Sequence, residues 1–290
     1  MTLTKTCEKV TRLDVFLRRE MQLSSSLVGR LKWQNALLVN GVPAHTDHMV
    51  QPGDVVSVEI LEQAEGFPPQ ELPLAILYED DACIALDKPA GMLVHPSPQR
   101  NEGTLANGVL YYYEKTAQHC AVHPVTRLDR DTFGVVLLAK NAHVHALLCA
   151  MLKARQMEKI YHAAVFGAPT ADRGSIDFPV YKIGGGSLLR TVDSRGQSAL
   201  TEYEVLAQHE QTSLLSLHPV TGRTHQLRLH CMAAGFPILG DPQYRSPASA
   251  AFSEAAGIAP QQLCAKQLRF THPLTGEAVC ITSKQTVIFP

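Results

Sequence analysis

Residues 126–134 hold the side chains best suited to chemistry in this sequence. Four of them are charged: Arg127, Asp129, Arg130 and Asp131. An apolar run at 135–139 follows directly. A polar loop that leads into a buried strand can present a carboxylate from a rigid scaffold. Such a carboxylate can act as a nucleophile, and the simpler alternative is a salt-bridged turn at the surface.

Three other segments carry groups that could assist a carboxylate. Residues 86–96 place Lys88 and a Pro-Ala-Gly turn beside an apolar strand. In residues 159–167, Tyr161 alternates with apolar neighbours, a position where tyrosines are more often packed than catalytic. Residues 217–230 pass from a strand through a glycine turn into a basic, histidine-bearing helix start that includes Arg223.

Size and composition predict a soluble protein of about two domains. The 290 residues are 45% hydrophobic and 18% charged. The first residues lack the basic-then-apolar pattern of a signal peptide, and the apolar runs are too short to span a bilayer. The seven cysteines are scattered and never spaced as C-x-x-C, which favours reduced thiols and a cytoplasmic location.

The histidine count and the net charge have to be interpreted from where the residues stand in the sequence. Among thirteen histidines, His143 and His145 are the closest pair, but a spacing of two on a helix points them apart, so we expect no metal site. The formal net charge of -1 gives no global sign of nucleic-acid binding. Between Lys5 and Lys32, however, seven Lys and Arg residues stand against three acidic residues, and a local basic patch can bind phosphates.

The chain divides into a small unit at 1–62, a linker at 63–73 and a large unit at 74–290. The small unit shows helical spacing from Val10 to Leu17, a second helix capped by Ser24–Ser26, and an Asn40-Gly41 hairpin turn. In the large unit, Asn141 is expected to cap a helix whose apolar stripe packs in the core, and Gly184–Gly186 are expected to form a flexible loop. The basic residues of the small unit are Arg12, Arg18, Arg19, Arg30 and Lys32.

The small unit resembles the RNA-binding domain of the ribosomal S-four type. The matching residues are R-L-D-x-F-L from Arg12, L-S-S-S-L-V-G-R-L from Leu23, L-V-N-G from Leu38 and V-Q-P-G-D-V-V from Val50. The resemblance implies that the basic residues contact RNA phosphates. The simpler reading is a helical subdomain with a solvated basic face.

The whole chain resembles the RluA-type family of pseudouridine synthases. Four motifs stand in family order: L-D-K-P-A-G, R-L-D-R-D-T-x-G, K-x-Y-x-A-x-V-x-G and G-R-T-H-Q-L-R-x-H. The resemblance implies isomerisation of specific uridines in structured RNA without cofactor or metal. It implies an α+β fold, with a mixed, largely antiparallel central sheet and flanking helices. It also favours large-subunit ribosomal RNA over transfer RNA as substrate, and we expect a monomer.

The same resemblance assigns roles to five residues. Asp129 would lie at the sugar–base junction and attack the sugar, add to the uracil or assist elimination. Tyr161 would stack on the uracil and could take a proton, Arg223 would pair with Asp129, and Leu227 would pack on the base. Arg127 would either fill the stack vacated by the extruded base or contact a phosphate.

Two positions depart from the family pattern, and two other functions compete. Thr126 stands where the family often has His, and Phe133 where it often has Ser. We interpret Asp131 as a turn residue that accepts hydrogen bonds from backbone amides. The competing functions are a non-catalytic RNA-binding protein and a hydrolase that would release free uracil.

Overall fold

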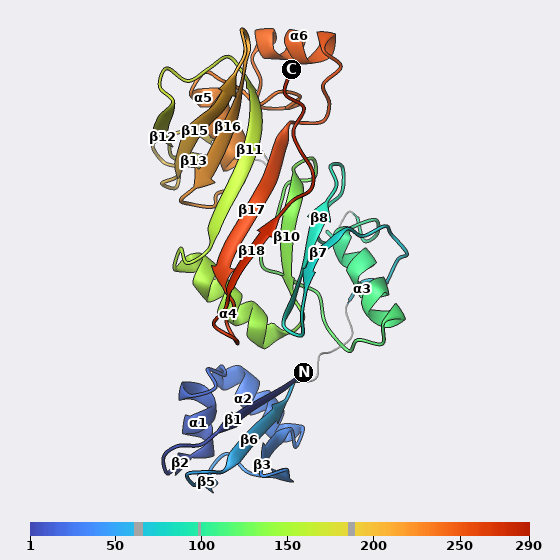
Figure 1. Ribbon diagram of the computed structural model, residues 1–290, viewed down its shortest axis with the longest axis vertical. Helices are drawn as coiled ribbons and strands as arrows, with labels where there is room; N and C mark the ends of the chain where they lie inside the picture. Colours follow the sequence, from blue (N-terminus) through green and yellow to red (C-terminus); the bar gives the residue numbers. More distant parts are fainter. Residues whose placement is uncertain (61–65, 98–99, 185–188) are drawn as a thin grey trace.

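The computed structural model describes residues 1–60, 66–97, 100–184 and 189–290. It shows a small amino-terminal unit at one end of a large sheet (Figure 1). Of the expected glycine loop, Gly185 and Gly186 lie outside the described residues. The helices described are all too short or too polar to cross a membrane.

The small unit is a four-stranded antiparallel sheet covered by two helices. Its strand order is β1 (Thr2–Thr6), β6 (Val55–Glu59), β3 (Leu37–Val39) and β4 (Val42–Pro43). The helices are α1 (Leu13–Arg19) and α2 (Ser25–Trp33), and β2 (Thr11–Arg12) pairs with β5 (Met49–Val50). One core holds the unit together, with Leu13, Leu17 and Leu31 from the helices and Val56 and Val58 from the sheet.

Local signals placed most of these elements correctly. The Ser24 hydroxyl accepts a hydrogen bond from the Leu27 amide at 3.1 Å, so the predicted cap is confirmed. Asn40 and Gly41 both have positive φ, at 51° and 79°, as the hairpin turn between β3 and β4 requires. The first helix begins at Leu13 and not at Val10, which is 57% exposed. Strand β1 was not predicted, because most of its residues are polar.

The described part of the predicted linker, residues 66–73, runs extended along helix α3 (Leu105–Lys115) of the large unit. The Asn107 side chain donates to the Pro68 carbonyl at 2.8 Å, and the Gln70 amide donates to the Asn107 carbonyl at 3.0 Å. Phe67 is buried in the core beneath α3. This stretch is therefore an extended segment that packs on the large unit.

The large unit is built on one ten-stranded sheet. The main order is β12 (Arg173–Asp177), β15 (Leu200–Gln208), β16 (Thr212–Pro219), β11 (Glu158–Phe166), β17 (Leu263–Thr271), β10 (Phe133–Ala139), β8 (Cys83–Lys88) and β7 (Ile76–Glu79). Strand β18 (Ala278–Thr282) pairs with β17, and β9 (His123–Pro124) pairs with β10. Only β10 and β17 pair in parallel among these strands. The predicted mixed, largely antiparallel sheet is confirmed.

Helices cover both faces of the sheet at β10, which explains why this strand is apolar throughout. Val135 and Leu137 share a core with helix α4 (Ala142–Lys153), whereas Val136 and Leu138 share a core with α3. Successive side chains on a strand point to opposite faces, so both sets are buried. The Asn141 side chain accepts from the Val144 amide at 2.9 Å, which confirms the predicted cap of α4.

The other elements of the large unit belong to the carboxyl-terminal half of its sequence. They are helix α5 (Gln226–Ala233), helix α6 (Pro247–Ala255) and a ribbon of β13 (Val180–Lys182) with β14 (Arg190–Val192). Helices α3 and α6 were not predicted. Each has a capping box at its start, formed by Thr104 with Asn107 and by Ser246 with Ser249.

Gly134 lets β10 approach β17 closely. Its φ is +106°, and a Cβ built at this position would lie 2.4 Å from the carbonyl oxygen of Ala265. A side chain there would have to displace backbone. The glycine that closes the R-L-D-R-D-T-x-G motif is thus required by strand packing.

We expect Gly134→Ala to lower the free energy of unfolding by about 2–4 kcal/mol, from strain at positive φ plus overlap with backbone. Urea denaturation measures the loss. The matched control is Gly91→Ala, whose φ is +81° but whose added Cβ meets nothing within 4 Å. That control should cost only about 1 kcal/mol, and equal losses in the two variants would contradict the packing explanation.

Candidate active site

The register of the sheet brings together the Asp129 loop before β10, Tyr161 of β11 and the start of α5. Ala265 of β17 pairs with Gly134 at the start of β10 on one side and with Tyr161 of β11 on the other. Tyr161 also pairs with Leu217 of β16, whose end leads into α5. The start of β10 and the end of β16, which leads into α5, therefore both reach the level of Tyr161, on opposite sides of β11 in the sheet.

An ion-pair network joins the two loops. Arg228 of α5 donates through Nη1 to Oδ2 of Asp129 at 3.0 Å. Its Nε and Nη2 donate to the two carboxylate oxygens of Asp241 at 2.7 and 2.8 Å. Nη2 also donates to Gln243 at 3.0 Å, and the guanidinium lies 5.0 Å from the ring centre of Tyr244. Bidentate pairing with Asp241 fixes the guanidinium plane.

The two carboxylates of this network differ in exposure. The Asp241 side chain is fully buried and also accepts from the Gln243 and Tyr244 amides. The Asp129 side chain is 30% exposed, and its Oδ1 has no hydrogen-bond partner in the described part of the chain. Asp129 is therefore anchored through one oxygen and offers the other to solvent or substrate.

The predicted pairing of Arg223 with Asp129 is wrong. Arg223 is exposed, and its Nε donates to the carbonyl of Ser198 at 3.1 Å. The cause is the place where α5 begins. His225 has φ 57° and is the residue before the helix, so Arg223 lies in the turn that precedes it. Sequence reasoning missed both Arg228, which stands in the segment 217–230, and Asp241, because both are charged residues that the fold buries.

Gln226 fixes the turn that separates the two arginines. Its Oε1 accepts from the Thr221 hydroxyl at 2.8 Å and from the Arg223 amide at 2.9 Å. Its Nε2 donates to the Leu200 carbonyl and the Thr201 hydroxyl, both at 3.0 Å. These bonds hold the start of α5, from which Leu227 and Arg228 point into the protein.

His225 borders the same network. Its Nε2 lies 3.8 Å from Oδ2 of Asp129, and its Nδ1 hydrogen-bonds with the Tyr244 hydroxyl at 3.0 Å. Burial lowers the pKa of His225, although the charge of Asp129 opposes this. The imidazole is therefore neutral at neutral pH, and Arg228 supplies the positive charge beside Asp129.

Tyr161 lies in an apolar surround near Asp129. It packs at the edge of a core cluster that includes Leu217, Leu227 and Leu263. Burial raises the pKa of the Tyr161 hydroxyl, and the charge of Asp129 raises it further. The phenol is therefore a neutral group at neutral pH, suited to stacking and hydrogen bonding and not to acting as a phenolate base.

Lys88 is a buried residue that holds the Asp129 loop in position. Its side chain is fully buried, and Nζ donates to the carbonyls of Pro89, Met92 and Arg130 at 2.9, 2.8 and 2.9 Å. It thereby ties the turn after β8 to the residue that follows Asp129. Burial lowers the pKa of Lys88 to about 8, against the charges of Asp131 and Asp129, so the ammonium is largely protonated at neutral pH.

We expect Lys88 to make stability depend on pH. The unfolded chain keeps the lysine proton up to about pH 10.4, whereas the folded chain releases it near pH 8. Between these values the unfolded state binds more protons, so stability rises with pH. The free energy of unfolding of the wild type, minus that of Lys88→Met, should increase by up to about 3 kcal/mol across this window. A flat difference would mean that the three carbonyls hold the pKa at its ordinary value.

The remaining residues of the loop have distinct surroundings. Arg127 is exposed and makes no ion pair with any residue that the structure describes. Asp131 accepts from the Arg130 guanidinium at 3.1 and 3.0 Å, so its partner is a side chain and not the backbone amides that we expected. Thr126 accepts from the Leu137 amide at 2.9 Å, and Phe133 is buried. Both departures from the family pattern thus have structural roles in this chain.

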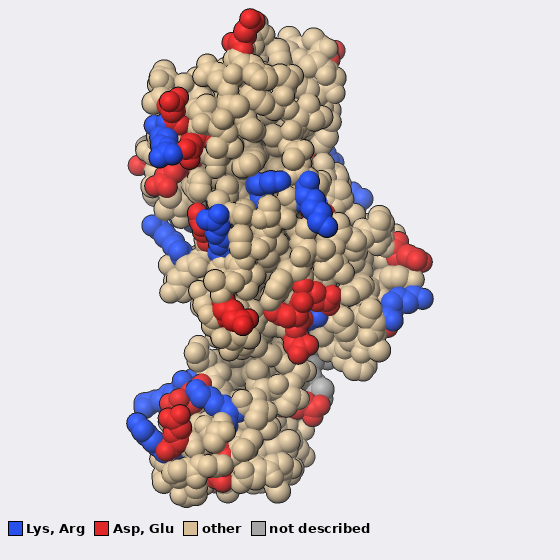
Figure 2. Space-filling model, in the orientation of Figure 1, with Lys and Arg blue, Asp and Glu red and all other residues tan. Residues whose placement is uncertain are grey.

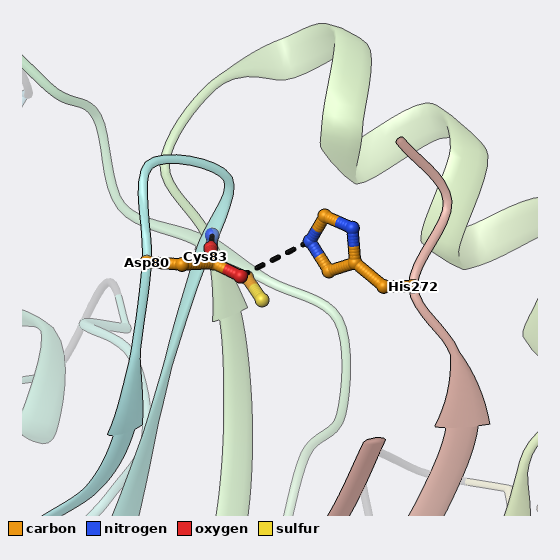
Figure 3. A group of neighbouring side chains, drawn as sticks. All are labelled: Asp80, Cys83 and His272. Carbon is orange, nitrogen blue, oxygen red and sulfur yellow. Dashed lines mark hydrogen bonds and ion pairs between the residues drawn. The ribbon is translucent and has the colours of Figure 1, made fainter. Parts of the chain in front are cut away.

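A second polar cluster lies away from this site, at the β7–β8 turn. Asp80, Cys83 and His272 converge there, with Asp80 Oδ2 at 3.1 Å from His272 Nε2 (Figure 3). Asp80 Oδ1 accepts from the Ala82 and Cys83 amides, and Asp80 also bonds with the Tyr78 hydroxyl.

The donor set of this cluster does not fit a metal ion. His272 Nδ1 accepts from the amides of Leu274 and Thr275 at 3.3 and 3.1 Å, so its proton is on Nε2, the nitrogen nearest Asp80. Burial raises the pKa of the Cys83 thiol, which keeps it protonated. The group is a close polar contact between the β7–β8 and β17–β18 turns.

Comparison with known proteins identifies the family. The sequence profile of RNA pseudouridylate synthase matches residues 82–233, which include the Asp129 loop, Tyr161 and Arg228. The chain is also 34% identical to the Bacillus subtilis RNA pseudouridine synthase YlyB over 277 residues, 94% of this chain and 89% of that protein. The chain belongs to the RNA pseudouridine synthase family. It is therefore an isomerase that acts on uridines in RNA.

Other relatives and solved structures agree. The chain is 35% identical to ribosomal large subunit pseudouridine synthase D of Pseudomonas aeruginosa over 260 residues, 87% of this chain and 81% of that protein. The structure of human RNA pseudouridylate synthase domain containing 4 superposes with a TM-score of 0.59 at 26% identity, over 72% of this chain and 88% of that one. The fold of this synthase is thus shared with solved members of the family.

Proposed function

We propose that this synthase isomerises uridines in large-subunit ribosomal RNA and that Asp129 is its catalytic carboxylate. The observation that carries the assignment is the asymmetric setting of Asp129. One oxygen is held by Arg228 at 3.0 Å, and the other accepts no hydrogen bond from any described residue in a side chain that is 30% exposed. The ribosomal substrate is supported by relatives named ribosomal large subunit pseudouridine synthase D in Pseudomonas aeruginosa and Vibrio cholerae.

The reaction breaks the bond from N1 of uracil to the sugar, turns the base and joins its C5 to the same sugar carbon, while C5 loses its hydrogen as a proton and N1 gains a proton. The free oxygen of Asp129 can attack the sugar, add to the uracil ring or remove a proton for elimination, and each route needs it next to an extruded nucleotide. Arg228 aims the carboxylate in all three. Tyr161 contributes a neutral ring and hydroxyl to the bound uracil, and Leu227, which is 7% exposed, packs in the same cluster.

Arg127 is the proposed RNA-facing residue of the loop. It is exposed, stands two residues before Asp129 and has no counter-ion in the described ranges. A guanidinium plane can stack on bases or pair with a phosphate. Either contact places it against the RNA that surrounds the extruded uridine.

The test of the substrate is a map of pseudouridines in RNA from cells that lack the gene. We expect one or more sites in large-subunit ribosomal RNA to remain uridine. The wild-type gene should restore them, and the Asp129→Asn gene should not. Loss of pseudouridine from transfer RNA alone, with ribosomal RNA unchanged, would overturn the ribosomal assignment.

We also propose that the amino-terminal unit is an RNA-binding domain of the S-four type. Figure 2 shows that basic and acidic side chains are mixed over this unit. Asp14 pairs with Arg12 at 3.1 Å and with Arg18 at 2.9 Å, which neutralises part of the predicted patch. Three predicted residues make no ion pair within the described chain: Arg19, Arg30 and Lys32. Lys32 lies 5.8 Å from the ring of Trp33, which is 84% exposed and open to a base.

We expect the unpaired cations to carry most of the phosphate binding. Replacing Arg19, Arg30 and Lys32 with Gln should reduce the slope of log affinity against log salt by about 0.7–0.9 for each phosphate that the domain no longer neutralises. The matched control replaces Arg12 and Arg18, whose charges Asp14 partly offsets, and should change the slope less. Filter binding to a large-subunit ribosomal RNA transcript at several salt concentrations measures both. If the salt slope changed equally per replaced residue in the two variants, the unpaired cations would not bind phosphate better than those paired with Asp14.

A further inference from the structure

A basic groove adjoins the candidate active site. It has a volume of about 1030 Å³ and runs between the end of α4, the first residues of β11 and the turn at 219–223. Five basic residues line it: Lys153, Arg155, Lys159, Arg223 and Arg269. Two acidic residues, Glu158 and Glu202, line it as well, and Glu158 pairs with Arg269 at 3.2 Å. The groove therefore has an excess of positive charge.

Lys159 lies between this groove and Tyr161. It lines the groove and also the small space at Tyr161, two residues further along β11. Its Nζ lies 3.7 Å from the position that a Cβ on Gly222 would occupy. The ammonium therefore lies against the glycine that precedes Arg223, and the two cations flank one turn.

Neither cation has a counter-ion in the part of the chain that the structure describes. The Lys159 ammonium forms no hydrogen bond or ion pair with a described residue, and burial lowers its pKa. Arg223 uses only Nε, toward the Ser198 carbonyl at 3.1 Å, so its two terminal nitrogens have no protein partner in the described residues. A partly buried, unpaired ammonium is unfavourable unless an anion joins it.

We propose that Lys159 and Arg223 together bind a backbone phosphate of the RNA strand next to the target uridine. This inference rests on the proposed placement of the reacting nucleotide at Asp129. A phosphodiester fits because the groove carries excess positive charge, Lys159 also lines the space at Tyr161, and Gly222 beside Lys159 has no side chain to block an approaching phosphate. The role differs from the one first predicted for Arg223, which was to hold Asp129.

The test is steady-state tritium release from total RNA that is labelled with [5-³H]uridine and taken from cells lacking the gene. This probe contains the target whichever RNA class holds it. We expect Lys159→Gln and Arg223→Gln each to raise KM about three- to tenfold and to flatten its salt dependence by about 0.7–0.9 in slope. We expect kcat to stay within about twofold. Lys159→Arg, which keeps the charge, should retain the wild-type slope.

The matched control is Arg173→Gln, an exposed arginine on β12 that does not line the groove and pairs with Glu204. It should leave KM and slope unchanged. The proposal is overturned if the two groove variants behave like this control, or if they lower kcat while KM and slope stay constant. Because the probe holds every RNA class, a wrong ribosomal assignment leaves this test intact. A wrong catalytic assignment shows separately, as turnover by Asp129→Asn.

Discussion

Asp129→Asn should lower the rate of tritium release by at least about 10³-fold, the size of effect expected when a catalytic carboxylate is lost. Asparagine keeps the shape and can still accept from Arg228, so the loop geometry is largely preserved. It lacks the negative charge and the nucleophilic oxygen that the reaction needs. Single-turnover rates at saturating enzyme measure the chemical step without the contribution of RNA binding.

The control for this prediction is Asp131→Asn. Asp131 lies two residues away, in the same loop, and its carboxylate binds the exposed Arg130 guanidinium. Losing an ion pair at this level of exposure should cost no more than about 1 kcal/mol, and activity should remain within about tenfold. If Asp129→Asn retained wild-type turnover, or if Asp131→Asn were the inactive variant, the catalytic assignment would be wrong.

Arg228→Met should impair both folding and catalysis. Asp241 is fully buried and depends on the Arg228 guanidinium for its charge partner. Removing one member of a buried pair is expected to lower the free energy of unfolding by about 3–5 kcal/mol. Asp129 would lose the bond that aims it, and a small displacement of a reacting group can reduce the rate by about 10²-fold. Urea denaturation and single-turnover rates, measured where the variant is still folded, report the two effects.

Arg223→Gln tests whether Asp129 is paired with Arg228, as observed, or with Arg223, as predicted. Arg223 is exposed, and its side chain bonds to only one group among the described residues, the Ser198 carbonyl, so its loss should change the free energy of unfolding by no more than about 0.5 kcal/mol. Its kcat should stay close to that of the wild type. A large fall in kcat for Arg223→Gln, with little effect of Arg228→Met, would restore Arg223 as the partner of Asp129.

Local sequence signals were reliable where they act within a few residues. The Ser24 and Asn141 caps and the Asn40-Gly41 turn each depend on neighbouring backbone groups, and each is present. The apolar run 135–139 was recognised as a strand, but the sequence could not show that helices cover it on both faces. Helix α3 was missed because its capping box, Thr104 with Asn107, departs from the usual pattern that ends in Glu or Gln.

The error at Arg223 has a specific cause. Both arginines stand in one basic segment, and nothing in their spacing indicates which of them faces Asp129. The decision depends on the helix start, which Gln226 sets by bonding to Thr221, to Arg223 and to residues of β15. The partners of Gln226 on β15 are distant in sequence, so the local sequence pattern cannot indicate them.

By itself, the sequence determined the family, the fold class and the loop that carries Asp129, because motif residues and the period of apolar residues are local properties of the chain. Only the tertiary structure decided which cation holds Asp129, that Asp241 fixes this cation, and that Tyr161 is a neutral phenol. These properties arise from burial and from contacts between β10, β11 and α5, which the register of β17 brings together. The strength of a charge interaction depends on its surroundings, and those surroundings exist only after folding.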